Sequence, residues 1–317
     1  MMADYGNYRL GSYLREFGPE MLLRTSITRL MRMLHFPNGV IEFADERKWS
    51  YVVEFLKRYY GGCIIDYSES RDLENLATIN EDSPIWLFWW QGIERAPELV
   101  KACVSSIERN AGDRKVIVID KHNLNDLVRI DCRIMDRVMS GQVSLTHFSD
   151  ILRFSLLSQN GGIWMDATMY MFAPFPEFVS KCPYFSQKLG FGPGPWTDFF
   201  QGSGPGNPFT TSVMNILSQY NIEHEQILTY LLVDCAMRAV YEHSKDYSRL
   251  VEAPDDVGND MFGLANSLDL PFAVQLWEEM KTGPNFVSKL SYKVGHPLTV
   301  DGKLTFYGKI ITEGALP

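Results

Sequence analysis

The sequence predicts an α/β protein with a mostly parallel central sheet and an N-terminal helical extension. Two observations support this prediction. Short apolar runs at 85–90, 115–119 and 163–165 alternate with segments of helical periodicity, and strands that alternate with helices form parallel sheets. Residues 1–78 show helical periodicity instead. We therefore expect a helical region at 1–78 and one α/β domain at 79–317.

The N-terminal region should contain two amphipathic helices. Apolar residues recur with helical spacing at 23–34 and at 49–60, and the turn sequence Phe-Pro-Asn-Gly at 36–39 separates the two segments. We expect Met31 and Met33 of the first segment to lie in the core, because methionine fills gaps between packed helices.

The first of these helices is basic. It carries Arg24, Arg29 and Arg32, and no acidic residue follows them before Glu42. A basic amphipathic helix of this kind can lie on an anionic membrane surface. The same composition also fits a helix that packs on the α/β domain with its arginines in solvent. The sequence leaves both interpretations open.

The composition indicates a globular protein and argues against nucleic acid as a partner. The 317 residues are 45% hydrophobic and 22% charged, and the net charge is −9. Five scattered cysteines lack metal-binding spacing, so we expect reduced thiols. No apolar run reaches the roughly 20 residues of a membrane-spanning helix, and we recognise no signal peptide. We therefore expect a cytoplasmic protein, with any membrane contact peripheral and on the inner face.

The elements of the α/β domain should follow one another in a regular order. The first strand, at 85–90, precedes a helix at 97–108 and a strand at 115–119. Residues 190–208 are rich in glycine, proline and aromatic side chains, and we expect loops that line a cleft. Helical patterns resume at 209–241 and at 266–281.

The segment 147–168, HFSDILRFSLLSQNGGIWMDAT, is the most informative part of the chain. Asp150 and Arg153 are three residues apart and share a face of a helix for which Ser149 is the expected N-cap. The sequence Asn-Gly-Gly should end this helix, and a buried strand that stops at Asp166 follows. Ligand sites in open α/β sheets lie beyond the carboxyl ends of strands. These three charged side chains should therefore converge on a ligand.

Two carboxylates and a guanidinium at one site suit a sugar nucleotide. Carboxylates accept hydrogen bonds from paired sugar hydroxyls, while a diphosphate leaving group needs nearby positive charge. The segment 281–309 contains five lysines and only Asp301 as an acid. Lys289, Lys293 and His296 are therefore candidates for the diphosphate, although a solvated surface hairpin explains the same composition.

Aromatic residues near the end of the first strand could stack on a nucleobase. The candidates are Trp86 and Trp89, with Gln91 close enough to reach the base or ribose. Because alternate residues face opposite sides of a strand, at least one of Trp89 and Trp90 should lie in the core, as should Trp164. The acidic residues that could meet an acceptor are Asp198, Glu225 and Asp234.

The segment 147–168 resembles the signature of the capsular polysaccharide synthesis proteins in glycosyltransferase family 32. It is more distantly similar to the yeast-type initiating mannosyltransferases and to the glucosylating clostridial toxins. In those proteins an Asp and an Arg three apart on a helix contact the donor sugar, and a strand after Gly-Gly ends in Asp-x-Asp. Weaker matches, such as WLFWWQG from residue 86 and KLSYK from residue 289, extend the resemblance over roughly residues 84–310.

The resemblance implies a GT-A (Rossmann-like) fold and a glycosyltransferase that moves a hexosyl residue from a nucleoside-diphosphate sugar. A UDP-sugar is the expected donor, and retention of anomeric configuration is the expected outcome. The acceptor would be lipid-linked or a growing capsular or exopolysaccharide chain. A toxin-like protein glycosyltransferase and a degenerate, non-catalytic nucleotide-sugar-binding protein remain as alternatives.

The resemblance also implies roles for individual residues. Catalysis would depend on Asp150, Arg153 and Asp166. Donor binding would add Trp86, Trp89, Gln91, Thr168, Lys289, Lys293 and His296. Mn²⁺ or Mg²⁺ would be bound by Asp166 and His296. The sequence departs from the family pattern at Thr168, which replaces the second Asp of Asp-x-Asp and is a poorer ligand for a hard cation. Either Asp166, the diphosphate and a C-terminal group bind a metal weakly, or lysines replace the metal.

Overall fold

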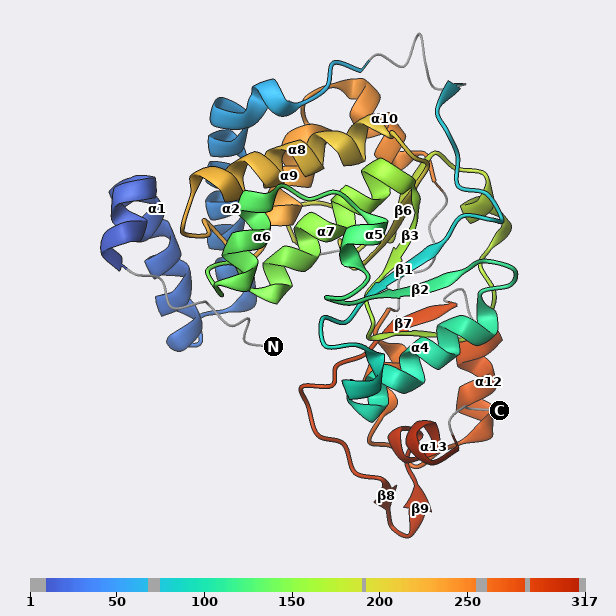
Figure 1. Cartoon of the computed structure of the whole chain (residues 1–317). Helices are drawn as coiled ribbons and strands as arrows, with labels where there is room; N and C mark the ends of the chain where they lie inside the picture. The colour runs from blue at the N-terminus through green and yellow to red at the C-terminus, as the bar shows by residue number, and fades with distance from the viewer. Residues whose placement is uncertain (1–9, 68–74, 190–191, 255–260, 283–285, 314–317) are drawn as a thin grey trace.

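The structure is a computed structural model that describes residues 10–67, 75–189, 192–254, 261–282 and 286–313. The chain forms a central sheet with helices on both faces (Figure 1). The strands of this sheet, in the order β2-β1-β3-β6-β5, are Val116–Ile119, Ile85–Phe88, Gly162–Met165, Phe200–Ser203 and Tyr184–Ser186. Because β6 alone is antiparallel to its neighbours, four of the five strands run in one direction. The predicted mixed α/β fold with a mostly parallel sheet is confirmed.

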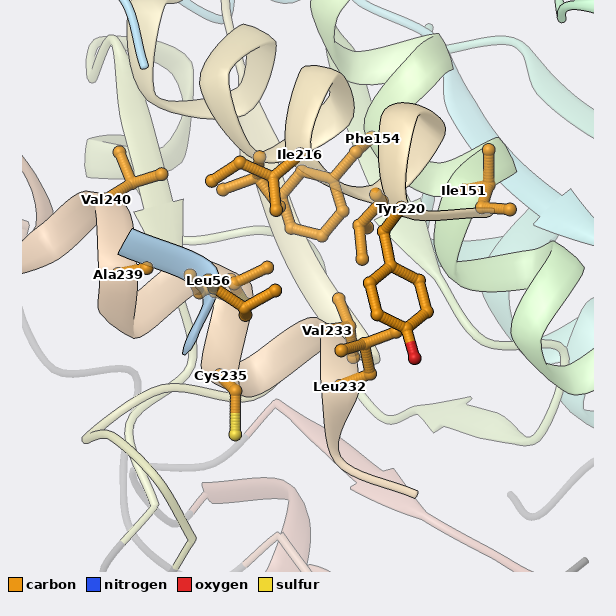
Figure 2. Packing of buried hydrophobic residues seen from close by; sticks show 14 of the residues in the cluster. Leu56, Ile151, Phe154, Ile216, Tyr220, Leu232, Val233, Cys235, Ala239 and Val240 are labelled. Carbon is orange, nitrogen blue, oxygen red and sulfur yellow. The ribbon is translucent and has the colours of Figure 1, made fainter. Parts of the chain in front are cut away.

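The two predicted N-terminal helices are present as α1 (Leu10–Met33) and α2 (Asn38–Tyr60). Gly18, with a φ of 77°, and Pro19 interrupt the helical backbone of α1. α2 packs against α9 (Leu232–Tyr241), and both share a core with α7 (Leu145–Asn160) and α8 (Pro208–Glu223). Figure 2 shows Leu56 of α2 among side chains of α8 and α9 in this cluster. The N-terminal helices thus contribute to the same core as the helices beside the sheet.

One prediction for α1 is wrong. The expected core position of Met33 is 65% exposed, and Met31 is only half-buried. The buried side chains of α1 are Tyr13, Phe17, Met21 and Thr28. Met33 therefore lies on a face of α1 other than the one that packs on the protein. The ion pair between Arg32 and Asp45 also joins α1 to α2.

The central sheet has a different core on each face, as alternation along the strands requires. Trp86 of β1 and Trp164 of β3 lie in the cluster with α7 and α8, and the predicted core position of Trp164 is confirmed at 1% exposure. Ile85 and Leu87 point to the opposite face, where Ile107 of α4 (Glu98–Asn110) covers the sheet. The sheet is thus buried on both faces, and ligands can reach it only at its edges and strand ends.

The remaining elements surround this sandwich. Short helices α5 (Leu124–Leu127) and α6 (Cys132–Met139) precede α7, and α10 (Lys245–Glu252) follows α9. In the C-terminal part, the structure has α11 (Gly263–Ser267), α12 (Val274–Thr282) and α13 (Phe306–Glu313). Two small sheets pair β4 (Met169–Met171) with β7 (Val287–Lys289) and β8 (Thr299–Val300) with β9 (Lys303–Leu304).

Several predicted boundaries need correction. The first strand ends at Phe88, so residues 89 and 90 lie in the turn beyond it. The region expected to be only loops contains β6, because its backbone pairs with both β3 and β5. The helical pattern predicted at 209–241 is two helices, α8 and α9, separated by a loop. The helix predicted at 266–281 is interrupted before α12, where Pro271 forms an isolated bridge with Thr305.

Candidate functional site

α7 positions Asp150 and Arg153. The helix begins earlier than predicted, because the Ser144 hydroxyl accepts a hydrogen bond from the backbone N–H of His147 at 3.3 Å. The expected cap, Ser149, lies inside the helix and donates to a backbone carbonyl instead. Gly161, with a φ of 67°, ends the helix as predicted.

Arg153 is the centre of the site. Its side chain is 2% exposed and its guanidinium stacks over the ring of Trp164 at 5.0 Å. Nη1 donates to Asp150 Oδ1 at 3.0 Å and to Asp198 Oδ2 at 2.8 Å, and Nη2 donates to Asp166 Oδ1 at 3.2 Å. Burial alone would lower the pKa of Arg153, but the three carboxylates raise it above its ordinary value. The structure thus brings together Asp150, Arg153 and Asp166, and it adds Asp198, which the sequence suggested only as an acid that could meet the acceptor.

Asp166 lies immediately after β3 and is held from both sides. Its Oδ1 accepts from Arg153 and from the indole N–H of Trp164 at 3.0 Å. Its Oδ2 pairs with the ammonium group of Lys289, which β7 presents opposite Met169 of β4. Burial would raise the pKa of Asp166, but the charges of Lys289 and Arg153 lower it below its ordinary value. Asp166 is therefore an ionised carboxylate between two cations.

A fourth aspartate, Asp234, lies in the first turn of α9 and is 8% exposed. Burial, followed by the charges of Asp198 and Asp150, raises its pKa well above the ordinary value. Burial also raises the pKa of Asp198, although Arg153 opposes this effect. Asp150, Asp166 and Asp198 each pair with Arg153, and Asp166 also pairs with Lys289. The site thus has more carboxylates than cations. A proton is therefore lost from Asp198 or Asp234 less readily than from an ordinary carboxyl group.

The three candidates near the first strand have different surroundings. Trp86 is 4% exposed and its indole N–H donates to the carbonyl of Gly161 at 2.7 Å, so its ring packs in the core. Trp89 is half-buried and packs against the small apolar cluster of Ala96, Val100 and Ala167. Gln91 is exposed in the following turn. Of these residues, Trp89 is the one whose apolar contacts include a cluster with Ala167, the residue after Asp166.

The C-terminal candidates are also divided. Lys289 joins the cluster through Asp166, whereas Lys293 is exposed. His296 Nδ1 lies 2.8 Å from Asp269, and its ring lies 5.4 Å from that of Tyr307. These contacts of His296 belong to the C-terminal elements, whereas Asp166 contacts Arg153, Trp164 and Lys289. Thr168 is 9% exposed, and its backbone carbonyl accepts a hydrogen bond from the N–H of Leu290.

The residues expected to hold a metal already contact protein groups: Asp166 contacts Arg153, Trp164 and Lys289, and His296 contacts Asp269. In the part of the chain that the structure describes, no three His, Cys, Asp or Glu side chains gather as a set that could bind a metal ion. Both oxygens of Asp166 already accept from cationic or N–H groups. Mg²⁺ and Mn²⁺ require several oxygen ligands close to the ion. Lys289 therefore supplies a positive charge beside Asp166.

Sequence reasoning missed the contribution of Tyr230. This residue lies between α8 and α9, and its ring is 6.4 Å from that of His147. Burial, followed by the charge of Asp150, raises the pKa of Tyr230. His147 itself lies 3.7 Å from Asp150. No local pattern marks Tyr230, because a long-range packing of α9 against α8 brings it to the site.

Comparison with known proteins identifies the family. A family model described as "Capsular polysaccharide synthesis protein" matches residues 34–310. The chain belongs to this family. The match includes every residue of the Arg153-centred cluster, so the cluster lies in the part of the chain that family members share. The resemblance to capsular polysaccharide synthesis proteins noted from the sequence is confirmed.

The other comparisons add less. A search of curated proteins finds no match. Among solved structures, the chain is similar to one titled "PaToxG Glycosyltransferase", with 13% sequence identity and a TM-score of 0.40. The similarity covers 61% of this chain and 78% of that one.

Proposed function

We propose that this capsular polysaccharide synthesis protein is a glycosyltransferase of family 32 with a GT-A fold. It transfers a hexosyl residue, with retention, from a nucleoside-diphosphate sugar, for which a UDP-sugar is the expected donor. The acceptor is lipid-linked or a growing capsular or exopolysaccharide chain at the cytoplasmic face of the membrane. The observation that carries the proposal is the buried Arg153, which holds carboxylates from three separate segments at the carboxyl end of β3.

The geometry suggests a separate role for each of the charged groups. Asp150 and Asp198 are aligned by the fixed fork of Arg153 and can accept hydrogen bonds from sugar hydroxyls. Asp166, at the strand end, is placed to accept from the ribose. A rigid arrangement of this kind favours reaction because the ordering of the groups is completed during folding rather than during transfer.

Lys289 is proposed to stabilise the charge that develops on the leaving diphosphate. Its ammonium group is anchored by Asp166 and lies 4.8 Å from the centre of the Phe199 ring, which limits its exposure to water. A positive group held in such surroundings stabilises developing negative charge more than a freely solvated one. The alternative, a Mn²⁺ or Mg²⁺ ion held by Asp166 and the diphosphate, is tested by the same assay.

The decisive experiment measures release of nucleoside diphosphate from a panel of nucleotide sugars, with Mn²⁺ and separately with EDTA. We expect release from at least one donor, and we expect it to persist in EDTA. Asp166→Asn should reduce release by about 100-fold or more, as loss of a preorganised electrostatic contact does. Asp131→Asn, a change at a surface acid paired with Arg133, is the matched control and should leave release unchanged.

Three outcomes would change the proposal. Release by Asp166→Asn at the wild-type rate would remove the site assignment. Binding of a donor, detected by thermal shift, without any release would favour the non-catalytic binding protein. Release only with Mn²⁺ would still support a glycosyltransferase, but a metal ion rather than Lys289 would then bind the diphosphate.

A further inference from the structure

One face of α1 and of the turn after it exposes four large aliphatic side chains to solvent. Leu23, Ile27, Leu30 and Leu34 are 59%, 39%, 54% and 60% exposed. Their spacing of four, three and four residues places them in one stripe along the helix. The buried Met21 and Thr28 of α1 lie on the opposite side. α1 therefore has two apolar faces: Tyr13, Phe17 and Met21 are buried against the protein, whereas this second stripe remains exposed.

The apolar surface continues at the start of α2. Phe36, Val40 and Phe43 are 41%, 41% and 67% exposed. Among the described residues, ten of the nineteen large hydrophobic side chains that are exposed lie between residues 10 and 43. Scattered apolar residues on a surface need no explanation, but such a concentration indicates an interaction surface. We call the residues 23, 27, 30, 34, 36, 40 and 43 the hairpin face.

The charge around the hairpin face is opposite to that of the whole protein. The chain carries a net charge of −9, whereas residues 10–60 contain eight Lys and Arg against six Asp and Glu. No acidic residue occurs between Glu20 and Glu42, and Arg29 is exposed within that interval. Arg24 pairs with Glu20 and Arg32 pairs with Asp45, so Arg29 contributes the exposed positive charge beside the hairpin face. An anionic surface with an apolar interior matches both properties.

We propose that the hairpin face docks on an anionic lipid bilayer as a peripheral anchor. In the described part of the chain, no helix has the length and apolar character to cross a bilayer. Shallow insertion of leucine and phenylalanine side chains, with arginine at the level of the phosphates, needs no such helix. The family match starts at residue 34, so most of the stripe on α1 precedes the matched region.

α1 also connects this surface to the candidate site. The hydroxyl of Tyr13 donates to the carbonyl of Leu228 at 2.9 Å, and the Glu16 carboxylate accepts from the backbone N–H of Gln226. These contacts hold the loop that carries Tyr230 beside the charged cluster. Docking would therefore fix the orientation of this loop relative to the bilayer. That a lipid-linked acceptor benefits from this orientation depends on the proposed function; the docking itself does not.

The test is co-sedimentation of the full chain with vesicles. Vesicles of neutral phosphatidylcholine and vesicles with about 30% phosphatidylglycerol are compared at low and high salt. We expect binding to the anionic vesicles that weakens at high salt, because salt screens the arginines. The double change Leu23→Glu and Leu30→Glu should lower the partition coefficient by about tenfold or more. Both positions are exposed, so circular dichroism should show an unchanged fold.

The matched control places the same charges on another exposed apolar site, with Leu270→Glu and Leu298→Glu, which are 49% and 46% exposed. This control should bind vesicles like the wild type. Failure of the wild type to bind anionic vesicles would overturn the proposal, and so would equal loss in both double variants. Light scattering that shows a dimer broken only by the changes in α1 would assign the face to a second copy. Donor hydrolysis in solution should be the same in all these variants. This assay tests the glycosyltransferase proposal, whereas vesicle binding tests the docking proposal, so a failure of one can be told from a failure of the other.

Discussion

Arg153→Met removes the positive charge around which the site is organised. The residue is 2% exposed and lies 2.8 Å from Asp198, 3.0 Å from Asp150 and 3.2 Å from Asp166. Methionine keeps the apolar part of the side chain and its contact with the Trp164 ring. The change therefore isolates the charge. Removing one partner of a buried ion pair costs about 3–5 kcal/mol, a large part of the roughly 5–15 kcal/mol that stabilises most proteins.

The pH dependence separates this electrostatic loss from a packing defect. The pKa of Asp166 is lowered in the fold, so its ion pairs stabilise the native state above its unfolded pKa, and this stabilisation is lost as the pH falls. In Arg153→Met the carboxylates lose their partner and can be neutralised by protons instead. We therefore expect the difference in unfolding free energy from the wild type to be largest near pH 7 and to shrink toward pH 4.

The measurement is urea unfolding followed by circular dichroism at both pH values. Arg153→Lys should fall between the wild type and Arg153→Met, because an ammonium group retains charge but cannot bridge three carboxylates. Arg133→Met, at an exposed pair with Asp131, is the control and should not shift the midpoint measurably. An equal loss of stability at pH 7 and pH 4 would refute the electrostatic reasoning and assign the effect to packing.

Two further changes test Lys289 and the backbone of β3. Lys289→Met should weaken binding of the donor's nucleoside diphosphate by about tenfold, measured by calorimetry in EDTA, since a charge-assisted contact contributes about 1.5–3 kcal/mol; unchanged affinity would contradict the role of Lys289. Gly162→Ala should lower stability by more than the roughly 1–3 kcal/mol of backbone strain, because φ is 105° and an added Cβ would lie 2.6 Å from the carbonyl oxygen of Pro84. Gly141→Ala, at a φ of 74° with open space around the Cβ, should cost less in the same urea experiment.

The sequence could predict those parts of the site that depend on local structure. Asp150 and Arg153 share a helical face whatever the helix packs against, and Gly161 ends that helix for reasons of backbone conformation. The strand before Asp166 could be recognised because three consecutive apolar residues follow a strong helix stop. The convergence of these residues is therefore a consequence of one helix, one turn and one strand.

The sequence could not predict contacts between distant segments. Lys289 reaches Asp166 from 123 residues away, through the pairing of β7 with β4. Trp86 resembled a stacking residue, but its ring fills the space beside Gly161, whose position depends on the register of β1 and β3. Helical periodicity likewise found the apolar stripe of α1 but gave no indication of whether protein, solvent or another partner covers it.

The excess of negative charge in the site leads to a last prediction, that donor binding takes up protons. Asp234 has a raised pKa because burial and the charges of Asp198 and Asp150 disfavour its ionised form. A bound diphosphate adds negative charge nearby, which raises these pKa values further, so affinity should fall as the pH rises through them. Calorimetry of UDP, or of the diphosphate of whichever donor is hydrolysed, in buffers of different ionisation enthalpy measures the protons taken up. Asp234→Asn should reduce this uptake and flatten the pH dependence, whereas Glu225→Gln, at an exposed acid, should not. Wild-type affinity that does not change with pH would show that the site accepts the diphosphate without protonating its aspartates.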